Sequence, residues 1–296
     1  MRKLVRPPKP PRCILRAQDA GSTNWQRLRG KDRREIWVKL NEMQHRICAY
    51  CERSFAEDDS HIEHLYPRAK YEGLTFEWKN LFGSCNSQYS CGIYKDSTKN
   101  PHEVNHELLI KPDQDDPTHY FRYYKNGRIS IRPQLSDTEF LEARETIQAF
   151  NLNHRTLVSW RQHHLAPLMQ MEEEFILWCD LCEEHPEMEL DLAAEIRLLL
   201  IEQIDTPFQS IKQHYIREHL DLLGLVSDSF IARKSGGSSQ KTRKSNQKNR
   251  KKTRKKRYNR HYNNRPKLGK GSKKRKPKSN HSSRSHTQSE GSSHQK

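Results

Sequence analysis

The sequence predicts an α+β protein: a small zinc-stapled module embedded in a mostly helical chain, followed by a disordered, basic C-terminal tail. Four cysteines gather with acidic, histidine and asparagine side chains between residues 47 and 96, the part of the chain richest in reactive groups. Stretches with helical periodicity follow this module. The end of the chain contains almost no aliphatic residues and cannot bury a core.

Changes in composition divide the chain into four expected regions. Residues 1–45 form a basic segment and a helix, 46–110 the compact module, 111–234 a mainly helical region, and 235–296 the tail. No run of about 18 apolar residues occurs, which predicts no membrane span. The charged start of the chain does not resemble a signal peptide.

Four cysteines predict a structural zinc site. Cys48 and Cys51 are separated by two residues, as in zinc knuckles, and Cys85 and Cys91 form a second pair further along. Four soft thiolates can complete the tetrahedral shell that Zn²⁺ prefers, although the five residues inside the second pair exceed the usual two to four. A disulfide is the alternative, and seven cysteines without a recognisable signal peptide argue against it.

A second pattern lies between the two cysteine pairs. It reads HIEHLYP over residues 61–67, then Asn80-Leu81, and the module ends with CGIYKD over residues 91–96. A histidine beside an acid is by itself more often a surface residue than a catalyst. Within this cysteine frame, however, the segment resembles an HNH endonuclease module. That resemblance implies the ββα-metal fold, in which two strands and a helix surround one divalent ion.

The resemblance implies roles that agree with the chemistry of phosphodiester hydrolysis. His64 would act as general base, because an imidazole with a pKa near ~6.5 accepts a proton at neutral pH. Glu63 would bind Mg²⁺ or Mn²⁺ through the oxygen donors that those ions prefer. Asn80 would orient the loop that carries His64. Arg68 and Lys95 would contact phosphate, unless they are ordinary solvated charges.

The sequence leaves the second ligand of the catalytic metal open. Many HNH modules place His or Asn directly after the last cysteine, where this chain has Gly92. Asn86, Asp96 and His61 are the three candidates. In an ideal strand His61 shares one face with Glu63, because side chains alternate between faces.

The flanks of the module are similar to the HNH nuclease subunit of Septu and retron anti-phage systems, over most of residues 1 to about 234. This resemblance implies a bacterial, cytoplasmic effector that acts with an ABC-type ATPase subunit and, in retrons, with the reverse transcriptase and its msDNA. The sequence contains no Walker A pattern, so any dependence on ATP would come from another chain.

Helical periodicity predicts several helices outside the module. A helix over about 24–44 would bury five apolar side chains, Trp25, Leu28, Ile36, Trp37 and Leu40. Ser136 and Glu139 form a capping box that begins another helix, with an apolar face of Phe140, Ile147 and Phe150. Further helices are expected over about 153–182, 190–204 and 207–223.

Cys179 and Cys182 form another CxxC pattern, inside a stretch that reads as a helix. No second cysteine pair follows, so we interpret both as ordinary helix residues, with redox chemistry or metal binding as the alternative.

The basic charge of the protein is concentrated in the tail. Residues 235–296 contain 22 Lys and Arg and one acid, Glu290, so their net charge is +21 and the rest of the +17 chain carries −4. Clusters such as Lys248–Arg257 attract polyanions without sequence preference, and Tyr258 and Tyr262 could stack on bases. We expect nucleic acid as the tail's partner; an acidic protein or plain solvation are the alternatives.

The sequence therefore predicts a metal-dependent endonuclease that hydrolyses phosphodiester bonds in DNA or in RNA such as tRNA. It would carry a structural Zn²⁺ and a catalytic Mg²⁺ or Mn²⁺. The alternative is a zinc-stapled module that binds nucleic acid or a partner without cutting. His64 and Glu63 favour the enzyme, and Gly92 at the usual ligand position keeps the alternative open.

Overall fold

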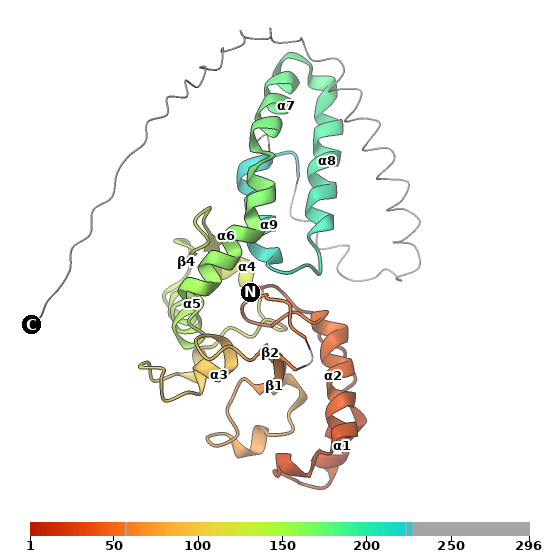
Figure 1. Ribbon diagram of the computed structural model, residues 1–296, viewed down its shortest axis with the longest axis vertical. Coiled ribbons are helices and arrows are strands. Elements are labelled where there is room, and N and C mark those ends of the chain that lie inside the picture. Colours follow the sequence, from red (N-terminus) through yellow and green to blue (C-terminus); the bar gives the residue numbers. More distant parts are fainter. Residues whose placement is uncertain (57, 223, 227–296) are drawn as a thin grey trace, which may run out of the picture. The chain divides into compact units, whose positions relative to one another are not determined.

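The computed structural model describes residues 1–56, 58–222 and 224–226, and the tail for which disorder is predicted lies outside them. The described residues belong to one compact unit. Helices combine with two small antiparallel sheets, which confirms the α+β class (Figure 1).

The α-helices and strands follow one another in this order: α1 (Arg12–Asp19), α2 (Gly30–Gln44), β1 (Ser60–His64), β2 (Leu81–Cys85), α3 (Cys91–Lys95), α4 (Pro117–Tyr120), β3 (Phe121–Tyr123), β4 (Ile129–Ile131), α5 (Asp137–Ala149), α6 (Arg155–Met169), α7 (Glu172–Glu184), α8 (Glu189–Glu202) and α9 (Gln209–Tyr215). Short 3₁₀ turns lie at Trp25–Arg27, Glu72–Leu74, Trp78–Asn80, His106–Leu108 and Pro186–Met188, and a π turn, Ile216–Leu220, extends α9.

The centre of the module is a strand–strand–helix unit. β1 pairs with β2 in antiparallel register from Ser60 opposite Cys85 to His64 opposite Leu81. All five residues of β2 are buried, and α3 packs against this strand. The order β1, β2, α3 places the cysteine pairs and the acid–histidine pattern around one small sheet.

Helix α2 covers the outer edge of β2. The side chain of Gln44 donates to the carbonyls of Ile47 and Gly83, and its oxygen accepts from the N–H of Gly83. A Cβ at position 83 would press on Trp37 and Gln44, so only glycine allows this close approach.

The helix predicted over 24–44 is interrupted before α2. Trp25–Arg27 form a 3₁₀ turn, Leu28 and Arg29 are extended, and Asp32 accepts from the N–H of Arg29 to cap the new helix. Of the predicted core residues, Trp37 is only partly buried and the others are buried: Trp25, Leu28, Ile36 and Leu40.

Helix α5 begins at the predicted capping box of Ser136 and Glu139. Its predicted apolar face is wrong at Phe140, which is 44% exposed, whereas Phe150 is fully buried. Small side chains such as Ala143 and Ala149 form the buried face, so the helix approaches its neighbours closely and its first turn stays in solvent.

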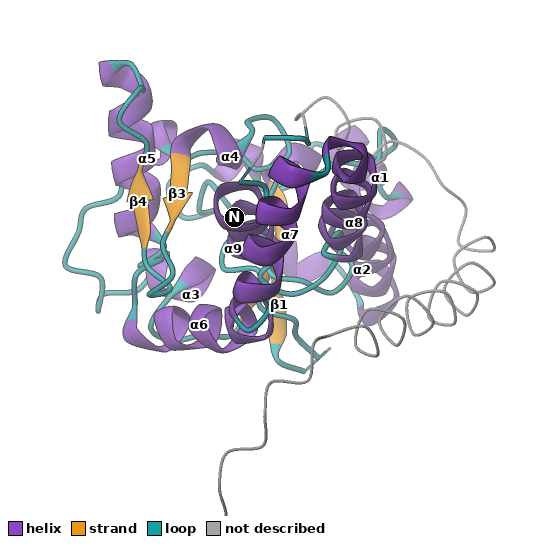
Figure 2. Cartoon of the chain, turned by 90° about the horizontal axis from the view of Figure 1, so that it is seen from above, coloured by secondary structure: helices purple, strands orange, loops and turns teal. Residues whose placement is uncertain are grey.

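The stretch expected to be helical over 153–182 is two helices, α6 and α7, broken at Gln170–Met171. Helices α7 and α8 contact each other and lie side by side in both views (Figures 1 and 2). Helix α9 packs on α6 and β3, while β4 lies against α5. Cys179 and Cys182 are buried, free thiols of α7, and burial raises the pKa of each.

Long-range contacts join the module to the helical region. Glu52, next to Cys51, accepts from the N–H of Ser210. Tyr50 stacks on Phe150 with ring centroids 3.9 Å apart. Each of these two contacts joins residues about one hundred or more positions apart in the chain. The module and the helices therefore share one core.

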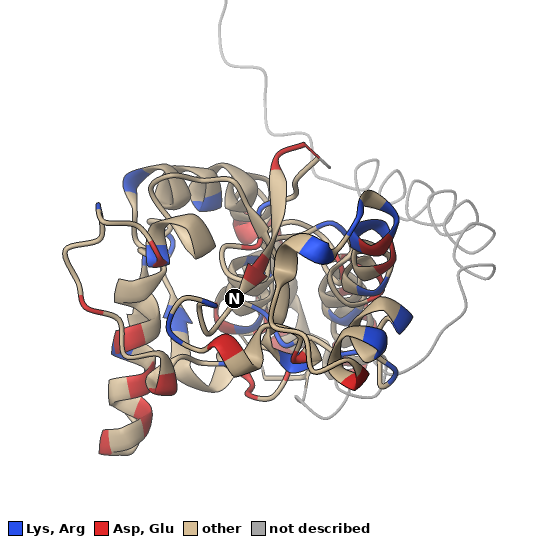
Figure 3. Cartoon of the chain, turned by 90° about the horizontal axis from the view of Figure 1, so that it is seen from below, with Lys and Arg blue, Asp and Glu red and all other residues tan. Residues whose placement is uncertain are grey.

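Positive and negative side chains are interspersed along the described elements (Figure 3). Among these residues, no helix is both long enough and apolar enough to cross a membrane.

Candidate functional site

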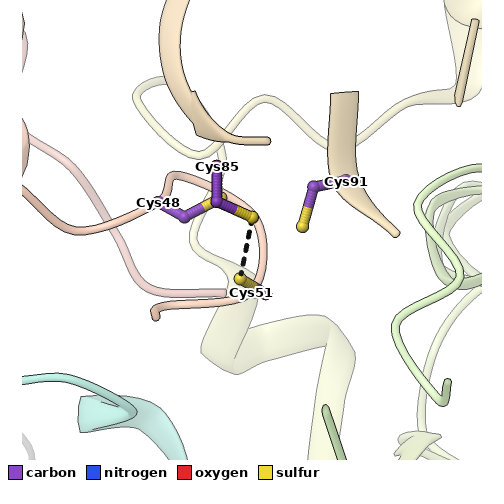
Figure 4. Close-up of side chains that lie close together, drawn as sticks. All are labelled: Cys48, Cys51, Cys85 and Cys91. Atoms are coloured by element: carbon purple, nitrogen blue, oxygen red, sulfur yellow. Dashed lines mark hydrogen bonds between the residues drawn. The ribbon is translucent and has the colours of Figure 1, made fainter. Parts of the chain in front are cut away.

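The four predicted zinc ligands converge on one buried point (Figure 4). The sulfur atoms of Cys48, Cys51, Cys85 and Cys91 all lie within 4.8 Å of one another. The sulfurs of Cys51 and Cys85 are 3.8 Å apart, and none of the four forms a disulfide. This cysteine cluster has the donors and the compactness of a structural metal site.

Backbone geometry brings the cysteines together from three segments. The N–H of Cys48 donates to the carbonyl of Arg53. Between these two residues the chain turns at Glu52, which has a left-handed φ of 66°. Cys85 ends β2. Cys91 begins α3 with a φ of 63°, and its N–H donates to the carbonyl of Phe150.

The protonation of the cysteine cluster is compatible with a bound cation. Hydrogen bonds from Cys48, Cys51 and Cys91 lower the pKa of Cys85, which favours its thiolate form. A buried thiolate needs a compensating positive charge, and a soft dication supplies it. The residues present therefore fit a metal such as zinc.

Glu63 lies in a buried group of charges on the face of β1 that meets α3. Its Oε2 is 3.0 Å from Nε2 of His61, and its Oε1 is 3.2 Å from the ammonium of Lys95. The same ammonium is 2.5 Å from Asp96 Oδ1. The other ring nitrogen of His61 is 2.9 Å from Asn86 Oδ1. We call these five residues the Glu63 cluster.

Electrostatics within the Glu63 cluster favour a charged carboxylate. Burial opposes ionisation of Glu63, but the charges of Lys95 and His61 outweigh it and lower the pKa of Glu63. Burial and the charge of Glu63 raise the pKa of Asp96 to about 6. Burial also opposes protonation of His61, yet its hydrogen bond with Glu63 prevails and raises the pKa of His61.

The donor set of the Glu63 cluster suits a hard divalent cation. Glu63 Oε1 is buried and accepts no hydrogen bond from the described residues; its near neighbour is the Lys95 ammonium. His61 presents Nε2 toward Glu63 while its Nδ1 is bound to Asn86. Carboxylate oxygens with one imidazole are ligands that Mg²⁺ or Mn²⁺ accepts.

Gly92 makes room for the carboxylate of Glu63. A Cβ built on Gly92 would overlap the Cδ and Oε2 atoms of Glu63. The N–H of Gly92 donates to Ser84 Oγ at 3.2 Å. A histidine or asparagine here would displace Glu63. The missing ligand at this position thus has a steric reason.

His64 is buried in an aromatic and basic surrounding. Its Nε2 lies 3.0 Å from the carbonyl oxygen of Thr75. The Trp25 ring packs edge-on against the imidazole, with the two ring centroids 4.5 Å apart. Because a carbonyl can only accept, Nε2 carries the proton and Nδ1 is the acceptor of the neutral ring. Burial, with the charges of Arg68 and Lys95, lowers the pKa of His64 to about 4, so the ring is neutral at pH 7.

Asn80 holds the loop that follows His64. Its Oδ1 accepts from the N–H of Tyr66 at 2.7 Å, and its Nδ2 donates to the carbonyls of Tyr66 and Leu74. Asn80 is 3% exposed, and the hydrogen bonds of its side chain go to backbone groups. Its hydrogen bonds fix the backbone on both sides of the loop.

The two residues expected to contact phosphate lie in different surroundings. Arg68 is exposed, and its guanidinium lies 5.7 Å above the Trp25 ring. Lys95 is 3% exposed, with its ammonium between Glu63 and Asp96. A contact of Lys95 with phosphate stays a prediction and requires a substrate that reaches into the Glu63 cluster.

Three residues at the site were not assigned a role from the sequence. Trp25 was expected in the core, but a helical pattern does not reveal that it packs on His64. Gln44 braces Gly83. Thr75 contributes a backbone carbonyl, for which side-chain chemistry gives no signal.

Replacement of Cys85 by serine should remove the bound metal and destabilise the fold, because metal binding contributes directly to folding. We expect the free energy of unfolding to fall by about 4 kcal/mol or more. Zinc content and thermal unfolding of the purified chain measure both effects. Cys182→Ser is the matched control and should retain zinc; equal zinc content in the two variants would contradict the assignment.

Gly92→Ala should displace the carboxylate of Glu63 while leaving zinc in place. A shift of about 1 Å in a catalytic group can cost about 10²-fold in rate, so we expect a loss of that order in the metal-dependent cleavage that the sequence predicts. Gly73→Ala is the control, since a Cβ there meets nothing within 4 Å. Equal activity of both variants would show that the position of Glu63 is unimportant.

Two curated proteins are similar to this chain, and no family model matches it. The Septu protein PtuB of Bacillus thuringiensis is 30% identical over 155 residues, which are 48% of this chain and 53% of that protein. A second relative, from Vibrio cholerae serotype O1 biovar El Tor, is described as a candidate HNH endonuclease of retron Vc95. It is 24% identical over 134 residues, which are 44% of this chain and 63% of that protein. The chain thus spans less than two thirds of either relative, and the predicted resemblance to Septu and retron HNH proteins is confirmed.

Proposed function

We propose that the protein is a metal-dependent HNH endonuclease that hydrolyses phosphodiester bonds. The observation that carries the proposal is the β1–β2–α3 unit, in which Glu63 and His64 are consecutive residues at the end of β1 and Cys85 and Cys91 of the cysteine cluster lie at the end of β2 and the start of α3. Similarity to two proteins named for HNH or Septu function adds support.

His64 would accept the proton of the attacking water. The hydrogen bond to Thr75 fixes its tautomer, and a pKa of about 4 keeps the ring unprotonated. The packing of Trp25 on the ring limits its rotation, which keeps Nδ1 in one direction. The low pKa makes His64 a weak base in isolation, so its contribution rests on position as much as on proton affinity.

Glu63 and His61 would be the protein ligands of the divalent ion. When bound, the ion would neutralise charge on the phosphate and make water more acidic. His61 is the better second ligand because Asn86 holds its Nδ1 and leaves Nε2 directed at Glu63. Asp96 shares its carboxylate with Lys95 and is the next candidate.

Asn80 would act as a positioning residue, since it contacts only the backbone of the loop. Arg68, exposed above Trp25, would bind a phosphate beside the scissile bond. Lys95 would neutralise Glu63 and Asp96 and would reach phosphate only by moving from this position.

The biological setting follows from the named relatives. We propose an effector subunit of a bacterial anti-phage system that works in the cytoplasm with an ABC-type ATPase and, in a retron, with the reverse transcriptase and its msDNA. DNA and RNA are both candidate substrates. The basic tail would add affinity for either polymer through its +21 charge.

One observation favours a second function, a binding module without catalysis. The ammonium of Lys95 lies between the two carboxylates of Glu63 and Asp96, where a metal ion would also lie. A lysine there can satisfy the buried acids without metal. Metal-dependent cleavage decides between the two functions.

His64→Ala should lower the cleavage rate by about 10²- to 10⁴-fold, because it removes the general base. We would incubate the wild type and the variant with plasmid DNA and total RNA in Mg²⁺, Mn²⁺ or EDTA, with and without the candidate ATPase. His185→Ala, at an exposed histidine, is the control. Full activity of the His64 variant would refute the role of His64, and no cleavage by the wild type would favour the binding module.

Truncation after Lys234 should weaken nucleic-acid binding and make its salt dependence less steep, because fewer counterions are released. Binding of a labelled oligonucleotide to the His64→Ala chain, measured at several salt concentrations, tests this. An unchanged slope would assign the tail to a different partner.

A further inference from the structure

An open cavity of about 660 Å³ lies outside the cysteine and Glu63 clusters. Its walls come from the N-terminal segment, α4, the residues after β4, and α9 with its π turn. The N-terminus lies beside α4 and α9 in both views (Figures 1 and 2). A volume of this size is typical of sites for small organic ligands and far exceeds that of a single inorganic anion.

The floor of the cavity is polar and rigid. Arg2 is 5% exposed, and its guanidinium donates to Asp205, to Gln209 and to the carbonyl of Gln44. Ser210 is buried beside it and donates to the carbonyl of Met1. These bonds fix the shape of the cavity in advance, which lowers the ordering cost of binding.

The charge of the lining selects an anion. Arg2, Lys3, Arg132 and Arg217 line the cavity together with one acid, Asp116, and Asp205 at 2.7 Å already matches the charge of Arg2. The carboxylate of Asp116 already accepts from the N–H and hydroxyl of Thr118. A concave wall with an excess of cations concentrates negative ligands.

Two of these cations have no acidic partner among the described side chains. The ammonium of Lys3 contacts only the carbonyls of Gln114 and Asp115. Nε of Arg132 donates to the carbonyls of Thr118 and Phe121, and the described residues supply no ion pair to its guanidinium. The terminal nitrogens of Arg132 can thus bind phosphate oxygens in a forked geometry.

We propose that this cavity binds a nucleotide, with its phosphates at Arg132 and Lys3. Gln134 lines the same cavity, and its amide supplies a donor and an acceptor for a base or a ribose. The amides of Gln209 and Gln213 also face the cavity but already bond each other, Arg2 and the carbonyl of Leu200. Val5 and Leu135 give a small apolar surface for the base. A purely apolar ligand would leave Arg132 and Gln134 desolvated without partners for their free polar atoms.

Occupancy of the cavity would bear directly on the nuclease module. Arg2 holds the carbonyl of Gln44, whose side chain braces Gly83 of β2. The N–H of Ser210 donates to Glu52, next to the cysteine cluster. Arg2 in the floor is therefore two hydrogen bonds away from Gly83 of β2, and Ser210 is one hydrogen bond away from Glu52, the neighbour of Cys51.

Binding of ATP, GTP, AMP and inorganic phosphate to the full chain tests the proposal. Isothermal calorimetry and thermal unfolding, without added divalent metal and in the His64→Ala background, keep the readout independent of cleavage. We expect a nucleotide to bind and to raise the Tm. Arg132→Gln should weaken binding about tenfold or more, the effect of losing one charged hydrogen-bonding partner.

Arg128→Gln is the matched control, because Arg128 is an exposed arginine of the same hairpin that does not line the cavity. Lys3→Gln is a second test variant if Arg132→Gln lowers the Tm without ligand. Equal weakening by Arg128→Gln would mean diffuse charge attraction and overturn the proposal. So would the absence of binding by every nucleotide, or binding of a short oligonucleotide alone, which would make the cavity part of a polynucleotide path.

Discussion

The convergence of four buried sulfurs is the constraint on which the rest of the structure depends. Cys48 and Cys51 precede the sheet, Cys85 ends β2 and Cys91 begins α3, so one cluster fixes the positions of three segments. A thiolate in this buried cluster would need a compensating cation, and a sheet of two five-residue strands is marginal without further support. The cysteine cluster therefore sets where β2 and α3 meet, and with them the place of Glu63 and Lys95.

The Glu63 cluster depends on that frame in a different way. A carboxylate that is 5% exposed is tolerated because a lysine and a histidine compensate its charge. Lys95 comes from α3 and His61 from β1, so the charges match only when the helix sits correctly on the sheet. His64 is held separately, by Thr75 and Trp25, on the loop that Asn80 braces. Separate contacts thus fix the side chains of Glu63 and His64, two consecutive residues of β1.

Local patterns in the sequence were enough to predict the parts of the site that local geometry controls. Strand alternation placed His61 and Glu63 on one face, and a capping box located the start of α5. Contacts between distant segments could not be predicted in this way. The packing of Trp25 on His64 and the bond between Glu52 and Ser210 depend on how whole elements meet.

One prediction was wrong because it used periodicity alone. Phe140 was expected in the core because it continues the apolar period of its helix, but periodicity does not tell where the neighbouring layer ends. At Gly92 the sequence showed that the usual ligand is missing, but only the structure shows that this position leaves space for the carboxylate of Glu63. Catalytic roles of individual residues remain predictions that the proposed variants test.

The contact of Gln44 with Gly83 has a consequence for the behaviour of the protein at high concentration. A two-stranded sheet exposes unpaired backbone groups along both outer margins, and such margins can recruit strands from other molecules. The amide of Gln44 bonds both the N–H and the carbonyl of Gly83, as a residue of a third strand would. Together with the N–H of Ala49, which also donates to the carbonyl of Gly83, this side chain closes the middle of the β2 margin to strands of other molecules.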